Sequence, residues 1–196
     1  MTSPATNALR QFFQLNGLSA VSVIEEALTH FDEKEIPRNA FHLKEGTVSN
    51  EYMVLESGFL RAFTHDVEGN EVTTGFFAPG AVVIEVASFF HRTPSRENIQ
   101  ALTDSKGWVI TFEKLNGLFH AYPAFREFGR SVLVKGFASL KERMLSMINE
   151  TAEQRYLALL QKNPAIFQQT PLKHLASYLG ITDTSLSRIR KEVTKK

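Results

Sequence analysis

The sequence predicts an α+β fold in three parts: a β sandwich, barrel or roll, then one long helix, then a bundle of short helices. Three observations support this prediction. Residues 36–112 alternate in hydrophobicity between turn signals, a proline-free stretch after Pro123 has a helical period, and the C-terminal segment has the spacing of a helix-turn-helix. The expected parts are residues 1–122, 123–150 and 151–196. A chain of 196 residues suits one ordinary domain or two small ones.

The first part is expected to begin with two helices, at residues 7–14 and 20–31, and to continue as β structure. In GFLRAFTHDVEGNEVTTGFF, two runs of alternating character flank the turn-rich DVEGN, which predicts a hairpin of residues 58–65 and 71–77. Further turn signals at residues 44–46, 56–58, 78–80 and 103–105 separate short strands at regular spacing. Such spacing is typical of an all-β sandwich, barrel or roll.

The long helix expected at residues 123–150 is predicted from the helical period of residues 124–163, a stretch that contains no proline. From Leu133 to Met147, apolar side chains recur at spacings of 4, 3, 4 and 3, which makes a narrow seam like that of a coiled coil. Gly136 costs about 1 kcal/mol inside a helix, and the close approach of a second helix would explain it. The residues assigned to a dimer helix are Phe125, Phe128, Val132, Leu133, Gly136, Phe137, Leu140, Met144 and Met147. The alternative is a long helix that packs on its own β domain.

Charge is distributed unevenly along the chain. Residues 151–196 hold eight Lys or Arg against three acids, a net +5, whereas the remainder has a net −4. A basic segment on a mildly acidic body favours a polyanionic partner, and the alternative is a lysine-rich tail exposed to solvent.

Several classes of protein are not expected. There are no cysteines, which excludes disulfides, cysteine-bound clusters and a cysteine nucleophile. No apolar run approaches the roughly 18 residues of a membrane helix, and the first residues do not resemble a secretion signal, so we expect a cytoplasmic protein without a membrane partner. Neither a phosphate loop, a nucleophile elbow nor a metal-ligand spacing is present, so we expect no enzyme activity and no metal site.

The strongest motif lies in PLKHLASYLGITDTSLSRIRKE. Ala176 allows two short helices to cross tightly, Gly180 suits the left-handed residue that ends the first helix, and Thr182 can cap the second. Leu186 and Ile189 are then expected to face inward. This is the pattern of a helix-turn-helix, whose second helix enters the major groove of DNA.

The exposed side of this motif carries short polar groups and cations, which suit base edges and phosphates. The predicted DNA-binding residues are Lys173, Thr182, Asp183, Thr184, Ser187, Arg188, Arg190 and Lys191. Arg188 is the best candidate for a bidentate contact with guanine, whereas Lys173, Arg190, Lys195 and Lys196 are expected to contact phosphates. The alternative is an ordinary helical hairpin with a solvated charged face.

The order of these parts resembles the Crp/Fnr family of bacterial transcription regulators. The resemblance rests on LKEGTVSNEYMVLESGFLRAF, GNEVTTGFFAPG, PSRENIQALTDS and LASYLGITDTSLSRIRK, and it covers nearly the whole chain. It implies a cyclic-nucleotide-binding-type β roll, a homodimer formed through the long helix, and operator DNA in two half-sites about one helical turn apart. RNA polymerase and an unidentified small-molecule effector are further partners that the resemblance leaves open.

Two departures from the family concern DNA. Most members continue into a β-hairpin wing, but only residues 191–196 follow Arg190 here, so the chain resembles a short, wingless variety or a truncated one. Thr184 stands where the recognition helix commonly begins with a glutamate, so the family's operator cannot be carried over.

A third departure concerns the ligand. In family members that bind cyclic AMP, a short helix and an arginine hold the cyclic phosphate, and a glutamate accepts a hydrogen bond from the ribose. The matching segment is IEVASFFHRTPSR, where Glu85 keeps the glutamate, Ala87 replaces a glycine, Ser95 takes the arginine's place and Arg96 comes one residue late. The candidate pocket is Glu85, Val86, Ala87, Ser95 and Arg96. We expect no cofactor and no response to cyclic nucleotides, and Glu85 is as well explained by an ion pair with Arg92 or Arg96.

Overall fold

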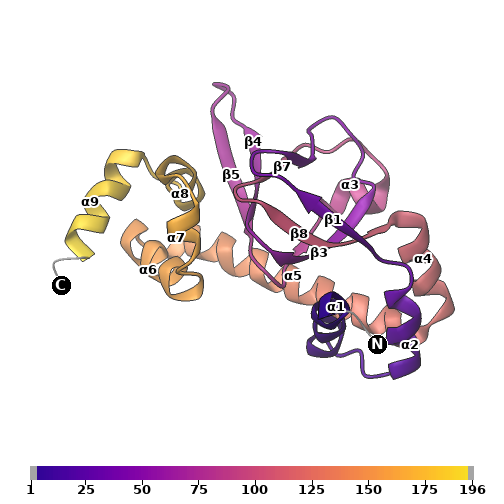
Figure 1. Ribbon diagram of the computed structural model, residues 1–196. Helices are drawn as coiled ribbons and strands as arrows, with labels where there is room; N and C mark the ends of the chain where they lie inside the picture. Colours follow the sequence, from indigo (N-terminus) through magenta and orange to yellow (C-terminus); the bar gives the residue numbers. More distant parts are fainter. Residues whose placement is uncertain (1–3, 194–196) are drawn as a thin grey trace.

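The computed structural model describes residues 4–193 (Figure 1), in which helices and strands follow one another along the chain. The N-terminal helices are α1 (Pro4–Leu15) and α2 (Val21–Leu28). The strands are β1 (Asp32–Ile36), β2 (Phe41–Leu43), β3 (Glu51–Ser57), β4 (Leu60–His65), β5 (Glu71–Phe77), β6 (Val82–Val83), β7 (Asn98–Ala101) and β8 (Ser105–Thr111). The later helices are α3 (Val86–His91), α4 (Phe112–Ala121), α5 (Pro123–Asn149), α6 (Ala152–Lys162), α7 (Ile166–Gln169), α8 (Leu172–Leu179) and α9 (Asp183–Val193).

The strands form two antiparallel four-stranded sheets, in the orders β1-β8-β3-β6 and β2-β7-β4-β5. Their facing sides enclose a core that includes Met53, Leu60, Val83 and Ile99, all of which are buried. The hairpin of β4 and β5 matches the sequence prediction, with Leu60 opposite Phe77 and His65 opposite Glu71. The predicted β roll is therefore present.

A second core joins the N-terminal helices to the first sheet and to the beginning of α5. Phe13 lies at its centre and contacts the rings of Phe12, Phe31, Phe125 and Phe128, at centroid separations of 5.3–6.0 Å. Aromatic rings at such separations attract one another beyond the gain from burial alone. The two predicted N-terminal helices thus pack as part of the β-roll domain.

The assignment of Phe125, Phe128 and Val132 to a dimer seam was wrong. Phe125 and Phe128 are buried in the protomer's own core, and Val132 packs against that core. Gly129 makes this packing possible, because a Cβ atom there would lie 2.5 Å from the Phe119 ring of α4. The start of α5 is therefore a structural element of its own protomer.

Beyond residue 132, α5 has a different surface. Apolar side chains along it are exposed, including Phe137 at 71%, Leu140 at 64% and Ile148 at 72%. Leu133, Met144 and Met147 of the predicted seam are also exposed, and nothing lies within 4 Å of a Cβ atom built on Gly136. Among the described residues, Gly180 at the end of α8 lies close to Met147, whereas Phe137 and Ile148 remain largely exposed.

Two elements were absent from the sequence prediction. Strand β1 begins at Asp32, before the predicted start of β structure at residue 36. The sequence did not predict it, because DEKEI has a single buried residue and therefore no alternation of apolar and polar side chains. Helix α4 follows β8 directly, and the Thr111 hydroxyl caps it by accepting from the N–H of Lys114. Among the described residues, no helix is both long and apolar enough to cross a membrane.

Candidate nucleic-acid interface and ligand cassette

The helix-turn-helix consists of α8 and α9, with the turn where the sequence places it. Gly180 ends α8 in the left-handed region at φ 68°, a conformation that glycine adopts without strain. The Thr182 hydroxyl then accepts from the N–H of Ser185 at 3.3 Å and caps α9. Leu186 and Ile189 are buried against α8 in a core that contains Leu175, Ala176 and Leu179.

The opposite side of α9 is exposed to solvent. Thr184, Arg188 and Lys191 are all exposed, and their spacing of four and three residues puts them on one face of the helix. The other predicted contacts are exposed as well, apart from the half-buried Ser187; they are Lys173, Thr182, Asp183 and Arg190. Lys195 and Lys196 lie outside the described residues. This face is accessible, as readout of DNA bases requires.

The face also lies at the far end of the molecule from the β roll. In Figure 1, α9 is the helix farthest from the β roll, and α8 stands between it and the hairpin β4–β5. The charged surface of α9 is therefore not covered by the roll. An α9 buried against the roll would have ruled out DNA readout.

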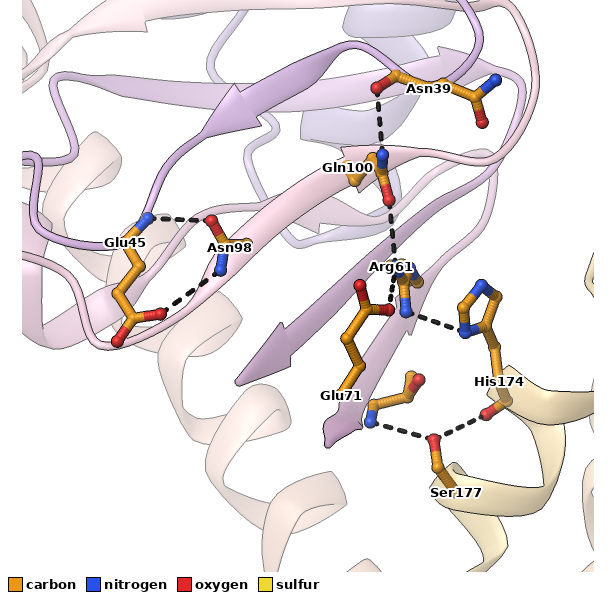
Figure 2. A network of polar contacts seen from close by, with 9 residues as sticks. Asn39, Glu45, Arg61, Glu71, Asn98, Gln100, His174 and Ser177 are labelled. Atoms are coloured by element: carbon orange, nitrogen blue, oxygen red, sulfur yellow. Dashed lines mark hydrogen bonds and ion pairs between the residues drawn. The ribbon is translucent and has the colours of Figure 1, made fainter. Parts of the chain in front are cut away.

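Helix α8 docks on the outer face of the second sheet through polar contacts (Figure 2). An η-nitrogen of Arg61 lies 2.8 Å from the Nδ1 atom of His174, and the backbone N–H of Thr73 donates to the Ser177 hydroxyl at 3.0 Å. Near the end of α8, the rings of Phe76 and Tyr178 lie 4.9 Å apart. These contacts fix the helix-turn-helix relative to the roll.

The C-terminal end of α8 is held from the other side by α5 and α6. Arg143 donates to the carbonyl of Tyr178 at 3.0 Å, and Arg155 donates to the carbonyl of Leu179 at 2.9 Å. Cations at this position also match the negative end of the helix dipole. Between the sheet and these helices lies a hollow of about 760 Å³, so α8 is not packed tightly on every side.

The candidate ligand cassette folds around Glu85. This carboxylate caps α3, because its two oxygens accept from the N–H groups of Ala87 at 3.1 Å and of Ser88 at 2.7 Å. Val86 and Ala87 are exposed on the first turn of the helix. The Glu85 carboxylate therefore occupies the N-terminal end of α3, where a bound anion would otherwise lie.

The expected ion pair between Glu85 and a nearby arginine was wrong. Arg92 donates instead to the carbonyls of Ser49 and Phe89, and its guanidinium lies 4.8 Å from the centre of the Phe112 ring. No ion pair joins Glu85 to Arg92 or Arg96 within residues 4–193. The partly buried carboxylate is satisfied by backbone groups alone.

Ser95 and Arg96 face in different directions. Ser95 is buried, and its hydroxyl donates to the carbonyl of Glu97 at 2.8 Å, whereas Arg96 is exposed. No hydrogen bond in the described chain brings either side chain to Glu85. The structure thus places a small hydroxyl on the inner side and the guanidinium outside.

Comparisons with known proteins find a family model for the β roll and similar folds for most of the chain. Residues 33–122 match the family model of the cyclic nucleotide-binding domain. FixK2 from Bradyrhizobium japonicum superimposes with a TM-score of 0.72 at 15% identity, over 84% of this chain and 85% of that one. A proposed transcriptional regulator of the Crp/Fnr family from Eubacterium rectale gives 0.70 at 14% identity, over 94% and 88%.

The fold is that of the Crp/Fnr regulators. The c-di-GMP-responsive global regulator CLP of Xanthomonas campestris shares this Crp/Fnr fold too, with a TM-score of 0.67 at 16% identity over 89% of this chain and 91% of that one. A search of curated protein sequences gives no significant match.

Within the Crp/Fnr fold, sequence reasoning missed the residues that join the two functional parts. Arg61 and His174 are 113 positions apart, so no local pattern could pair them. The only signal was Arg61 itself, a cation within the otherwise apolar run LRAF of a predicted strand. Among residues 4–193, no three potential metal ligands cluster closely enough to hold a metal ion.

We predict that Glu85→Ala lowers the stability of the β roll modestly. The loss of a helix cap costs about 0.5–2 kcal/mol, because two N–H groups lose their acceptor. Thermal unfolding followed by circular dichroism would measure the change, with the exposed Glu68→Ala as control. An unchanged melting temperature would mean that the cap contributes nothing.

Proposed function

We propose that this protein is a homodimeric, sequence-specific DNA-binding regulator of transcription that reads its operator through α9 and acts in the cytoplasm. One observation carries the proposal: the side of α9 opposite its buried Leu186 and Ile189 presents Thr184, Arg188 and Lys191 to solvent. Such side chains can bind base edges and phosphates in a major groove. The match to Crp/Fnr-type regulators in fold supports it.

The proposed dimer uses the exposed stripe on α5, and its occupant is the α5 helix of a second copy. Apolar residues at coiled-coil spacing over several turns of an exposed helix favour a second helix of the same pattern. A hollow of about 590 Å³ beside Leu133 and Phe137 continues the stripe towards Phe119 and Phe90. A symmetric dimer would present two α9 helices to half-sites roughly 34 Å apart.

We further propose that the protein does not respond to cyclic AMP. The N–H groups of Ala87 and Ser88 are occupied by the Glu85 carboxylate, which would repel a phosphate. An anion entering a partly buried site needs a compensating cation, and Arg96 lies outside. Glu85 already accepts one hydrogen bond on each of its oxygens, which leaves it fewer sites for a ribose hydroxyl.

Cyclic AMP at about 1 mM is therefore expected to leave the melting temperature unchanged. A ligand at 100 times its dissociation constant would stabilise the folded state by about 2.7 kcal/mol, a shift that is easily measured. Thermal unfolding with and without the nucleotide, with adenosine as control, makes the test. A rise caused by cyclic AMP alone would contradict this part of the proposal.

DNA binding itself is tested by fluorescence anisotropy with labelled duplex DNA at low and near-physiological salt. The affinity is expected to fall steeply with salt, because bound phosphates release counterions. Lys191→Ala should lower the magnitude of the salt slope by about 2, one for each protomer of the dimer, while weakening all sequences alike. Absence of binding at low salt would refute the proposed function.

A second candidate function is a ligand-binding or protein-interaction module whose terminal helices only close the fold. The docking of α8 on the sheet, with Phe59 and Phe76 packed against the core of the helical bundle, favours it. It does not explain why the cationic face of α9 is left exposed. In this second case, Arg188→Ala would change no binding property.

A further inference from the structure

Arg61 lies in an unusual environment for a guanidinium. It belongs to β4, between Leu60 and Ala62 of the inner core, and therefore points to the outer face of the sheet. Nevertheless only 3% of it is exposed, because side chains from β5 and β7 and from α8 surround it. A buried charge is retained only where partners compensate for its lost hydration.

The partners of Arg61 come from both functional parts of the chain. One η-nitrogen donates to Glu71 at 2.6 Å and to Gln100 at 3.0 Å, both in the sensor sheet, and the other faces His174 of α8 (Figure 2). Gln100 in turn donates to the carbonyl of Asn39. The rigid fork of the guanidinium thus ties the sensor sheet to the first helix of the helix-turn-helix.

The bond to α8 requires a neutral His174, since its Nδ1 atom must accept a hydrogen bond from the Arg61 guanidinium. Burial, together with the charges of Arg61 and Lys173, lowers the pKa of His174 to about 4, whereas Glu71 and Asp183 oppose the shift. At neutral pH the imidazole of His174 is therefore uncharged, and one of its ring nitrogens can accept a hydrogen bond. Protonation would place a second cation 2.8 Å from Arg61 and break the contact.

Helix α8 is held at its two ends by different elements. Arg143 and Arg155 hold the carbonyls at its C-terminal end, whereas the contact of Arg61 with His174 holds the N-terminal half. Loss of that contact would loosen α8 on the sheet, where the Thr73–Ser177 bond and the Phe76 and Tyr178 rings also hold it. Because Leu186 and Ile189 of α9 pack on α8, the reading face would move with it.

We propose that Arg61 is a positioning residue for DNA readout: it acts through His174 to fix the helix-turn-helix on the sensor sheet. This inference rests on the proposed function. In a dimer, specific binding needs both reading helices at the spacing of the two half-sites, so a mobile α8 weakens the complex. Contacts with a single half-site are affected less.

The test compares Arg61→Ala and His174→Phe with His174→Asn, whose side-chain oxygen can still accept from Arg61. Arg38→Ala, an exposed arginine of the same domain, is the matched control. Hydrogen exchange without DNA is expected to rise in residues 172–179 and at the Thr73 amide for the first two variants only. Their affinity for two half-sites should fall about tenfold, with dimerisation and circular dichroism unchanged.

The pH dependence of hydrogen exchange in α8 distinguishes the hydrogen bond between Arg61 and His174 from a role of Arg61 in packing alone. The docking stabilised by neutral His174 is complete above the ordinary histidine pKa near 6.5 and is lost as the pH falls towards 4. The protection factors of residues 172–179, which correct for the slower intrinsic exchange in acid, should therefore fall in that range for the native protein and not for His174→Asn. Equal profiles would overturn the inference.

The outcomes separate the two proposals. If the native protein binds DNA and Arg61→Ala binds equally well, the positioning role is wrong and the proposed function stands. If the native protein binds no DNA, the proposed function fails and the positioning role fails with it. If His174→Asn behaves like His174→Phe, the hydrogen-bond acceptor is not what fixes α8.

Discussion

Arg188→Ala is expected to abolish sequence-specific DNA binding while leaving the protein folded and dimeric. Arg188 is exposed in the middle of α9, whereas the neighbouring Leu186 and Ile189 are buried in the bundle core. A bidentate contact between arginine and guanine contributes about 1–3 kcal/mol of discrimination, and a dimer loses it twice. Specific affinity would then approach the non-specific level.

Titration of one selected operator and one scrambled duplex, at the same salt concentration, measures this loss. Lys141→Ala, which removes an exposed cation from α5, is the matched control for net charge and should bind both duplexes normally. If Arg188→Ala kept the preference for the operator, α9 would not be the reading helix. Equal weakening on both duplexes would reduce Arg188 to a phosphate contact.

Phe137→Asp is expected to convert the protein from a dimer to a monomer. Phe137 is 71% exposed in the protomer, so the substitution disturbs no internal packing. In the proposed dimer it would place two charges in an apolar seam, and truncation of a central aromatic residue at an interface can cost about 2 kcal/mol or more on its own. Sedimentation or light scattering at micromolar concentration distinguishes the two states.

Val67→Asp is the matched control, because Val67 is an equally apolar and fully exposed side chain at the tip of the hairpin β4–β5. It should leave the oligomeric state unchanged. The monomeric Phe137→Asp variant should also lose binding to paired half-sites, since two linked contacts bind far more tightly than one. A dimer that survives this substitution would place the interface elsewhere.

The sequence predicted those features that depend on local patterns. The hairpin, the turn at Gly180, the cap at Thr182 and the inward residues Leu186 and Ile189 follow from the chemistry of neighbouring residues, and the structure confirms each of them. The periodicity of α5 correctly indicated a long helix. Local periodicity could not show, however, where along α5 the helix stops packing on its own protomer and its apolar side chains become exposed.

For that reason Phe125 and Phe128 were assigned to the dimer seam. They share the helical period of the seam, but α1 and α2 cover them, and those helices lie more than 90 residues earlier in the sequence. The same limit applies to Arg61, whose partner His174 is distant in sequence. For Glu85, the sequence suggested an ion pair with a nearby arginine. In the structure the carboxylate caps α3 and accepts hydrogen bonds from backbone N–H groups, so it needs no charged neighbour.

The most direct test of the account is selection of DNA fragments by the native protein from a random duplex library, followed by sequencing. We predict enrichment of an inverted repeat whose half-sites are about one helical turn, roughly 10 base pairs, apart from centre to centre. Arg188→Ala, carried through the same selection, should enrich nothing. A library that shows no enriched sequence with the native protein, or the same sequence with Arg188→Ala, would contradict the account.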